Sequence, residues 1–213
     1  MSERRGCFIS LEGVEASGKS TLAKALGGRL RARGLDPLET REPGGTPVGD
    51  RLRSLFVDRT LALDPLCELF VVCAARAQHV SEVIGPALAA GRIVVCDRFA
   101  DATVAYQGFG RGLDLTFVRS CADAAAEGLE PDLTLLLDVR WEIARERLEN
   151  RAAGTEVDRL EAELESFHER VRAGYLELAH AEPNRFVVLD AAHAPQTLAD
   201  EAWRCVAPHL EVR

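Results

Sequence analysis

Short apolar runs alternate along the chain with longer segments whose apolar residues recur every three or four positions. The short runs predict five strands, at 7–11, 35–40, 93–96, 133–139 and 185–190. Most of them are apolar throughout, which is typical of strands inside a parallel sheet, although Pro37 weakens the start of the second. The alternation predicts a three-layer α/β fold in one domain, residues 1–213, with a five-stranded parallel sheet flanked by helices and right-handed crossovers.

The segments with helical spacing predict the helices of this fold. Asp64 and Pro65 form a start signal, a capping side chain followed by proline in the first turn, for a helix that runs to Ala90. Its first part, 66–75, is apolar nearly all round, so it is either a central helix of the monomer or a helix with one face against a partner subunit. Two further helices are expected to turn apolar residues inward: Leu52, Leu55 and Phe56 in one, and Leu160, Leu164, Phe167, Val171, Tyr175 and Leu178 in the other.

Composition and charge restrict the classes of function. A chain of 213 residues that is 47% hydrophobic can bury a substantial core. The formal net charge of −8 argues against general nucleic-acid binding but not against a small anionic substrate, because local arginines set the field of a site. The sequence has no apolar run of about 18 residues, so no membrane span is expected. Residues 1–6 are too short and polar for a signal peptide. The six scattered cysteines include no Cys-x2-Cys pair and favour reduced thiols in a cytoplasmic protein.

A phosphate-binding loop is predicted after the first strand. The order is strand, Gly-x4-Gly-Lys-Ser, then a helix with Leu22 and Leu26 on one face. The glycines let successive backbone N–H groups point at one anion, and the helix directs its positive end to the same place. Lys19 can reach the outer phosphates of a nucleotide, and Ser20 can hold Mg²⁺. The loop residues expected to bind ATP are Gly13, Val14, Glu15, Ala16, Ser17, Gly18, Lys19, Ser20 and Thr21.

Charged residues stand where other strands end, at 41–42, 97–98 and Asp138. Because ligands of such folds bind at the carboxyl ends of the strands, these residues are expected to gather at one edge of the sheet. A small, polar, arginine-rich segment at 151–159 interrupts two helices. Its composition fits a mobile lid over a phosphate, at approximately 147–159, and a plain solvated loop is the alternative.

Several blocks of the sequence resemble the bacterial thymidylate kinases, and they occur in order between about residues 7 and 190. The blocks are 12–21, Thr40-Arg41-Glu42-Pro43-Gly44-Gly45-Thr46, 75–79, Asp97-Arg98-Phe99, Ala105-Tyr106-Gln107-Gly108-Phe109-Gly110-Arg111-Gly112 and 131–134. The Arg-Glu-Pro-Gly-Gly and Ala-Tyr-Gln-Gly sequences are more specific than the phosphate loop. The resemblance implies a homodimeric kinase that transfers the γ-phosphoryl of ATP to dTMP with Mg²⁺, for dTTP synthesis.

The resemblance also implies roles for individual residues. Catalysis is expected from Lys19, Arg98, Arg151 and Glu15, with Arg98 bridging the two phosphates; the alternative for Arg98 is a structural ion pair with Asp97. Because the acceptor phosphate is already ionised, no general base is needed. Ser20 and Asp97 are the expected metal ligands. The residues expected around dTMP are Glu15 (3′-hydroxyl), Glu42 (metal or acceptor), Arg53 and Arg98 (phosphate), Val72, Arg76 (thymine carbonyl edge), Thr103 and Gln107 (base) and Tyr106 (sugar).

The sequence departs from the family pattern at three places. Val72 stands where the family usually has a phenylalanine stacked on thymine, Ala16 replaces a commoner glycine, and Ala102 replaces a usual serine. The neighbouring Phe70 lies about 200° away around a helix, so it does not simply take over the stacking position. Without an arginine at position 16, the lid is expected to supply one, and the candidates are Arg147, which is also expected to contact ATP, Arg151 and Arg159.

Three other functions compete with this interpretation. A GTPase switch needs an Asn-Lys-x-Asp element, whereas Asn150 and Asn184 are each followed by arginine. A kinase for another nucleoside monophosphate or a deoxynucleoside is a closer alternative, and a hydroxyl acceptor would need a carboxylate base such as Glu15 or Asp97. The third is a purely structural ATP-binding protein.

Overall fold

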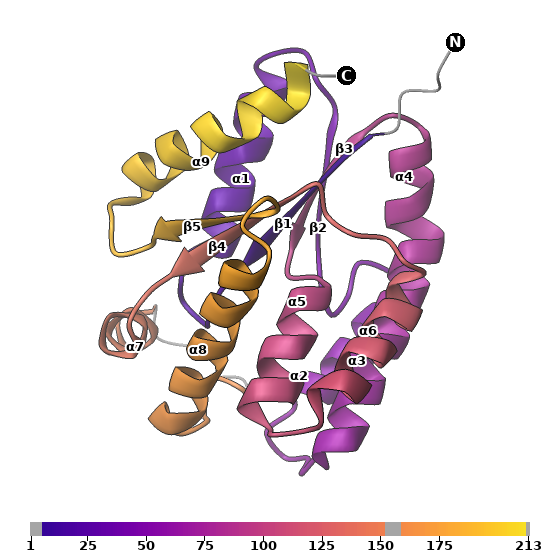
Figure 1. The fold of residues 1–213 in the computed structure, drawn as a ribbon, viewed down its shortest axis with the longest axis vertical. Helices are drawn as coiled ribbons and strands as arrows, with labels where there is room; N and C mark the ends of the chain where they lie inside the picture. Colours follow the sequence, from indigo (N-terminus) through magenta and orange to yellow (C-terminus); the bar gives the residue numbers. More distant parts are fainter. Residues whose placement is uncertain (1–5, 152–158, 212–213) are drawn as a thin grey trace.

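The chain folds into a five-stranded parallel sheet covered by helices on both faces (Figure 1). The structure is a computed structural model that describes residues 6–151 and 159–211. The strand order is β2-β3-β1-β4-β5, so β1 lies at the centre. The strands are β1 (Cys7–Glu12), β2 (Pro37–Arg41), β3 (Ile93–Asp97), β4 (Leu133–Asp138) and β5 (Phe186–Asp190). The predicted five-stranded parallel sheet is therefore confirmed.

Helices on the two faces make the outer layers. On one face α1 (Lys19–Arg31) packs against α9 (Pro195–Glu211), and both contact strands of the sheet. The other face is covered by α3 (Pro65–His79), α5 (Ala100–Thr103), α6 (Leu115–Ala126) and α8 (Glu165–Ala181). Two shorter elements, α2 (Pro47–Val57) and α7 (Trp141–Glu149), pack against α3 and α8 respectively.

The long helix predicted from residue 66 to residue 90 is continuous but changes its winding. Asp64 caps it by accepting a hydrogen bond from Leu66 N at 2.9 Å. After α3 the chain continues through the π-helix η1 (Val80–Ile84) into α4 (Gly85–Ala89). A second π-helix, η2 (Val104–Gly110), directly extends α5. Such wide turns occur often at functional sites, and η2 carries the Ala-Tyr-Gln-Gly sequence.

Three apolar positions differ from the sequence-based expectation. Leu55 on α2 is 49% exposed, although Phe56 beside it is buried. Leu160 and Leu164 precede α8, and Leu164 is 76% exposed. On α3, Phe70 is 50% exposed, so the alternative of a central helix buried on every side within the monomer is wrong, and the alternative of a face against a partner subunit stays a prediction. Helical spacing alone does not show which side of a helix meets another element, and an exposed apolar side chain is common.

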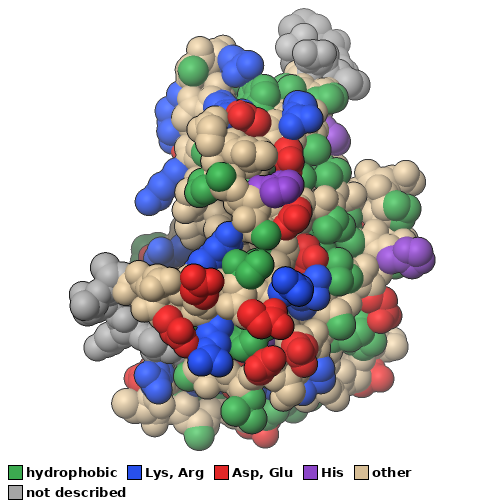
Figure 2. All heavy atoms as spheres, turned by 90° about the vertical axis from the view of Figure 1, so that its left-hand side faces the viewer, with side chains coloured by type: hydrophobic (Ala, Val, Ile, Leu, Met, Phe, Trp, Pro, Cys, Tyr) green, Lys and Arg blue, Asp and Glu red, His purple; other side chains and the backbone are tan. Residues whose placement is uncertain are grey.

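The surface, the cysteines and the helices add three observations. Figure 2 shows one face of the molecule, on which lysine and arginine side chains are interspersed with aspartate and glutamate and form no basic patch. This face offers no electrostatic footprint for nucleic acid. All six cysteines are free. No helix within residues 6–151 and 159–211 has the length and apolar character needed to cross a membrane.

Candidate functional site

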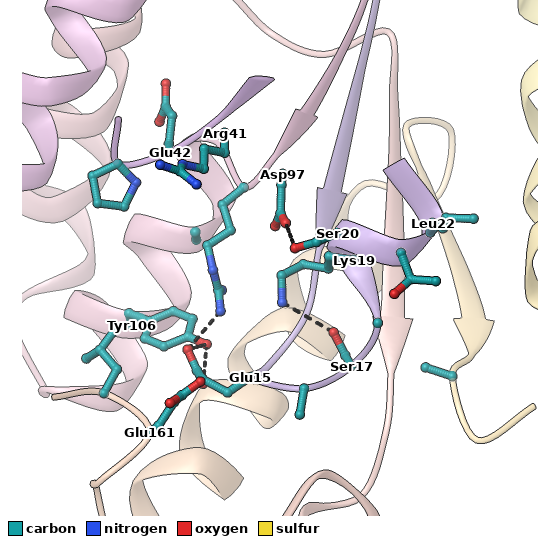
Figure 3. A pocket seen from close by; sticks show the side chains of 18 of the residues that line it. Glu15, Ser17, Lys19, Ser20, Leu22, Arg41, Glu42, Asp97, Tyr106 and Glu161 are labelled. Carbon is teal, nitrogen blue, oxygen red and sulfur yellow. Dashed lines mark hydrogen bonds and ion pairs between the residues drawn. The ribbon is translucent and has the colours of Figure 1, made fainter. Parts of the chain in front are cut away.

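A cavity of about 870 Å³ opens at the carboxyl ends of the central strands (Figure 3). Parallel pairing brings the chain segments together there, since Leu11 of β1 and Arg41 of β2 both pair with Asp97 of β3. Of the residues expected to act, all but Gly13, Val14 and the lid candidate Arg159 line it: Glu15, Ala16, Ser17, Gly18, Lys19, Ser20, Thr21, Glu42, Arg53, Val72, Arg76, Asp97, Arg98, Thr103, Tyr106, Gln107, Arg147 and Arg151.

The loop between β1 and α1 has the backbone of an anion cradle. Gly13, Ala16 and Gly18 all have positive φ, of 140°, 53° and 99°. A Cβ on Gly13 would lie 2.5 Å from the carbonyl oxygen of Leu137, so the chain can pass this point only as glycine. Ala16, where the family commonly has glycine, adopts the left-handed conformation despite its side chain.

Lys19 reaches back across this loop. Its Nζ donates to the carbonyl oxygens of Val14, at 2.8 Å, and Gly13, at 3.1 Å. Burial, followed by the nearby positive charge of Arg98, lowers the pKa of Lys19 to about 8. The two loop residues that do not line the cavity therefore hold the lysine with their carbonyl groups.

Ser20 and Asp97 join the first turn of α1 to the end of β3. Ser20 Oγ donates to Asp97 Oδ2 at 2.6 Å (Figure 3). A hydroxyl and a carboxylate oxygen suit Mg²⁺, which usually binds through few protein ligands together with water and substrate phosphates. No cluster of three or more histidine, cysteine or acidic side chains able to hold a metal occurs in the described part of the chain. These two oxygens thus fit a metal shared with a phosphate ligand.

Arg98 forms its ion pair with Glu15 and not with Asp97. Its Nη2 donates to Glu15 Oε1 at 2.8 Å, and its Nη1 donates to the carbonyl oxygen of Gly13 at 2.9 Å. The guanidinium carbon lies 4.7 Å above the Tyr106 ring, and the Tyr106 hydroxyl donates to Glu15 at 2.7 Å. Burial alone would raise the pKa of Glu15, but Arg98 and the nearby His168 lower it to about 2. Glu15 is therefore ionised at neutral pH.

Arg76 on α3 has a buried nitrogen without a partner. Its Nε donates to Glu42 Oε2 at 2.8 Å and its Nη2 to the carbonyl oxygen of Phe99 at 2.9 Å. Nη1 is buried and has no hydrogen-bond partner among the described residues. A buried donor left unpaired is costly, so this atom indicates a ligand acceptor in the cavity.

Glu42, expected beside the metal or the acceptor, mainly supports other side chains. It is buried and accepts from Arg76, while His79 Nδ1 lies 3.1 Å from its other oxygen. Arg53 on α2 donates to the carbonyl oxygen of Pro43, the next residue of the loop, at 3.1 Å. The loop after β2 thus positions one arginine through its carboxylate and another through its backbone.

The wall beside Val72 contains a ring that sequence reasoning missed. Val72 is 7% exposed and lines the cavity together with Thr103 and Phe56. Phe70 lies outside this wall, as its angle on the helix predicts. Phe56, on α2, is an aromatic side chain that lines the same cavity as Val72. Its place in the sequence, among apolar residues of a short helix, does not distinguish it from a core residue.

Two of the three candidate lid arginines line the cavity. Arg147 donates to the carbonyl oxygens of Ala16, at 3.3 Å, and Ala191, at 2.7 Å. Arg151 Nη2 donates to Glu161 at 2.8 Å. Arg159 instead donates to Glu68 at 2.8 Å and stacks over Phe56, behind the cavity wall. Residues 152–158 of the expected lid lie outside the described residues.

Buried polar residues behind the site were also missed. Glu68 is fully buried and accepts hydrogen bonds from Gln107, at 2.6 Å, and from Arg111 and Arg159. The sequence did offer a signal for Glu68, because it is a lone carboxylate in an otherwise apolar helix segment. His168 is also buried, stacks on Trp141 with ring centroids 3.9 Å apart, and has its Nδ1 3.4 Å from Glu15 Oε2. Nothing in the local sequence distinguishes it.

The comparisons with known proteins point to one family. A sequence model of the thymidylate kinase family matches residues 11–202. The thymidylate kinase of Desulfovibrio desulfuricans is 50% identical over 211 residues, 97% of each chain. That of Solidesulfovibrio magneticus is 52% identical over 208 residues, 95% of this chain and 100% of the relative. The crystal structure of thymidylate kinase from Ehrlichia chaffeensis superimposes with a TM-score of 0.76 at 30% identity, covering 95% of this chain and 99% of that one.

Proposed function

This chain belongs to the thymidylate kinase family, and we propose that it transfers the γ-phosphoryl group of ATP to dTMP, giving dTDP and ADP. The observation that carries the proposal is one cavity lined both by the phosphate loop and by Arg76, whose buried Nη1 has no hydrogen-bond partner among the described residues. The first suits a triphosphate, and the second suits a carbonyl oxygen of a nucleobase. The reaction is attributed to the whole chain as one domain.

The donor half of the site consists of the phosphate loop and the start of α1. Backbone N–H groups from Gly13 to Thr21 would bind the ATP phosphates, and Lys19 would exchange its carbonyl partners for phosphate oxygens. Arg147 already donates a hydrogen bond to the carbonyl oxygen of Ala16 in the phosphate loop, and it would contact ATP there. Ser20 and Asp97 would hold Mg²⁺, which when bound supplies positive charge next to the transferred group.

The acceptor half is formed by α2, α3 and η2. Arg76 Nη1 would donate to a carbonyl oxygen of thymine, with Val72, Thr103 and Gln107 around the base and Glu42 orienting Arg76. Arg53 and Arg98 would bind the acceptor phosphate. Glu15 would accept the hydrogen bond of the 3′-hydroxyl, with Tyr106 beneath the sugar.

Charge neutralisation and positioning are sufficient for the chemistry. The nucleophile is a phosphate oxygen of dTMP that is already ionised at neutral pH, so no residue has to remove a proton. The guanidinium groups of Arg98 and Arg151 and the ammonium of Lys19 line one cavity, and would stabilise the negative charge of the transferred phosphoryl group in the transition state. This explains why a site without a paired acid and base is chemically adequate.

The proposal includes a homodimer. Leu66 and Phe70 on α3 and Phe117 on the adjacent α6 are 40%, 50% and 43% exposed. Large apolar side chains on neighbouring helices favour a surface covered by a second copy. A cytoplasmic location belongs to the same proposal and is supported by the free cysteines. Sedimentation of the wild type and of Phe70→Asp tests the dimer, which the charge should dissociate.

Steady-state phosphorylation of a substrate panel tests the function. The acceptors are dTMP, dUMP, CMP, AMP and thymidine, each with ATP and Mg²⁺. We expect the highest kcat/KM with dTMP, because of Arg76, Thr103 and Tyr106. Equal or faster turnover of AMP would contradict the assignment of the base pocket, and equal turnover of thymidine would show that the acceptor is a hydroxyl group.

A further inference from the structure

Glu12 is a carboxylate with no exposed surface at the end of β1, directly before the phosphate loop. Its oxygens accept hydrogen bonds from Ser10 Oγ at 2.8 Å, Phe99 N at 2.7 Å and the Tyr175 hydroxyl at 2.8 Å. It is absent from the described lining of the cavity. Burying a carboxylate costs free energy even when it is hydrogen-bonded, so its presence directly before the phosphate loop needs a physical reason.

Two of these three hydrogen bonds, from Phe99 N and from the Tyr175 hydroxyl, connect Glu12 to Arg98. The amide of Phe99 immediately follows Arg98, whose φ of 74° is a left-handed conformation that non-glycine residues rarely adopt. On the N-terminal side of Arg98, its own backbone N–H donates to the carbonyl oxygen of Leu11 at 2.9 Å. These hydrogen bonds to the end of β1 hold the backbone of Arg98 in the strained conformation that directs its side chain into the cavity.

The third contact reaches the guanidinium group. Arg98 Nη1 donates to the Tyr175 hydroxyl oxygen at 3.2 Å, and that hydroxyl donates to Glu12. An ionised carboxylate only accepts hydrogen bonds, so Tyr175 must give its proton to Glu12 and turn a lone pair towards Arg98. Glu12 thereby fixes both the backbone and the charged end of one arginine.

We propose that Glu12 is a positioning residue for phosphoryl transfer, which acts through Phe99 N and Tyr175 to hold Arg98 in the orientation that bridges the two phosphates. The proposal rests on the proposed function, because it takes Arg98 as the residue in contact with the transferred group. Glu12 itself touches no substrate. Its loss should therefore lower kcat more than it changes substrate binding.

The ionisation of Glu12 provides a second readout. Burial and then the charge of Asp101 raise the pKa of Glu12 to about 7, against the opposing effect of Arg98. Glu12 is the carboxylate above this pH and the neutral acid below it, so the contribution of Glu12 to kcat should be lost as the pH falls through about 7. The titratable and charged groups around Glu12 are Asp101, Arg98, Tyr175, Lys19, Arg76 and Cys96.

The test compares Glu12→Gln, Tyr175→Phe and Ser10→Ala in otherwise complete protein. Ser10→Ala is the matched control, since it removes a hydrogen bond to Glu12 that does not lead to Arg98. Because this hydrogen bond lowers the pKa of Glu12, the limb near pH 7 should move to higher pH in Ser10→Ala and not disappear. At pH 8 we expect Glu12→Gln to lower kcat at least about tenfold with KM for dTMP and ATP within about threefold, Tyr175→Phe to act in the same direction, and Ser10→Ala to stay within about twofold. The limb of the kcat profile near pH 7 should disappear in Glu12→Gln. The same substrates are used throughout, so the titration of the dTMP phosphate is common to all profiles.

The background variant Arg98→Ala separates positioning from folding. If Glu12 acts through Arg98, adding Glu12→Gln to Arg98→Ala should change kcat less than about twofold. A folded Glu12→Gln with normal kcat, or one that costs a further tenfold without Arg98, would overturn the proposal. If Glu12→Gln does not fold, the kcat of Tyr175→Phe is judged by the same criteria. A wild type inactive on dTMP overturns the proposed function as well, which distinguishes the two failures.

Discussion

Arg98 and Glu15 form a buried ion pair in which Nη2 of the arginine lies 2.8 Å from Oε1 of the carboxylate. The pair joins the end of β3 to the phosphate loop, two segments separated by about eighty residues in the sequence. Tyr106 supports both members, with its ring beneath the guanidinium and its hydroxyl on Glu15. The group expected to bridge the phosphates is thus oriented before any ligand arrives, and this lowers the cost of ordering it during the reaction.

Replacing Arg98 should abolish most of the activity. We expect Arg98→Ala to reduce kcat at least about 10²-fold, the scale of losing one charge contact in the transition state. Steady-state kinetics with dTMP and ATP measure this, with circular dichroism as a control for folding. A variant with a nearly normal rate would remove Arg98 from the mechanism.

ATP binding should take up a proton through Lys19. The pKa of about 8 in the unliganded protein lies below the usual value, and the ATP phosphates should raise it. At pH 8.5, calorimetry in two buffers of different ionisation enthalpy should detect the uptake of roughly half a proton or more. Lys19→Met should lose this uptake, and an unchanged value would assign it to another group.

The same shift has a consequence for stability. Between about pH 8 and the ordinary lysine pKa, the unfolded chain binds a proton that the folded chain does not, so this lysine makes stability rise with pH. At pH 7 the buried charge is a net cost without ATP, and Lys19→Met should raise the Tm of the unliganded protein. A lower Tm would mean that the carbonyl contacts of Lys19 outweigh its desolvation.

Val72→Phe should tighten dTMP binding. A ring at this position can stack on the base, a contact of roughly 1 kcal/mol, so KM for dTMP should fall by about fivefold. Val72→Leu is the matched control, because it adds volume without a ring. An increase in KM in both variants would show that the wall formed with Phe56 is already filled.

Arg151 and Arg159 should behave differently although both flank the expected lid. Arg151 lines the cavity, so Arg151→Ala should lower kcat by at least about tenfold with little change in Tm. Arg159 lies behind the wall on Glu68, so Arg159→Ala should mainly lower Tm. Steady-state kinetics and thermal unfolding of the two variants distinguish the two roles. Equal losses of kcat would contradict the assignment.

Glu68→Gln should destabilise the fold. The carboxylate offsets the buried charges of Arg111 and Arg159, and breaking such a pair typically costs about 3–5 kcal/mol. Urea unfolding measures the loss. Glu161→Gln, which removes the partner of Arg151 at the cavity edge, is the comparison and should cost much less.

The sheet and the phosphate loop were predictable because their signals are local. A buried strand shows itself as an apolar run, and Gly13, Gly18 and Lys19 stand at a spacing set by the loop. Parallel pairing then puts the ends of β1, β2 and β3 at one edge, so the residues that follow them meet in one cavity. Their individual roles remain predictions.

The supporting contacts were not predictable because they depend on packing between distant segments. Arg159 does not line the cavity because its side chain binds Glu68, which is 91 residues away in the sequence. Arg98 selects Glu15 over its neighbour Asp97 for a similar reason, since the backbone at φ 74° turns its side chain towards the loop. Leu55 shows the converse: a helical pattern gives the apolar side of α2 but not the element that covers it.

The central position of β1 places the phosphate loop between two ends of the cavity that are built from different elements. The wall proposed to read the acceptor base comes from α2, α3 and η2, next to β2 and β3, whereas Ala191, His193 and Leu198 line the end beyond β5. We therefore expect that substitutions at the acceptor end can broaden the range of accepted monophosphates without altering the choice of phosphoryl donor at the other.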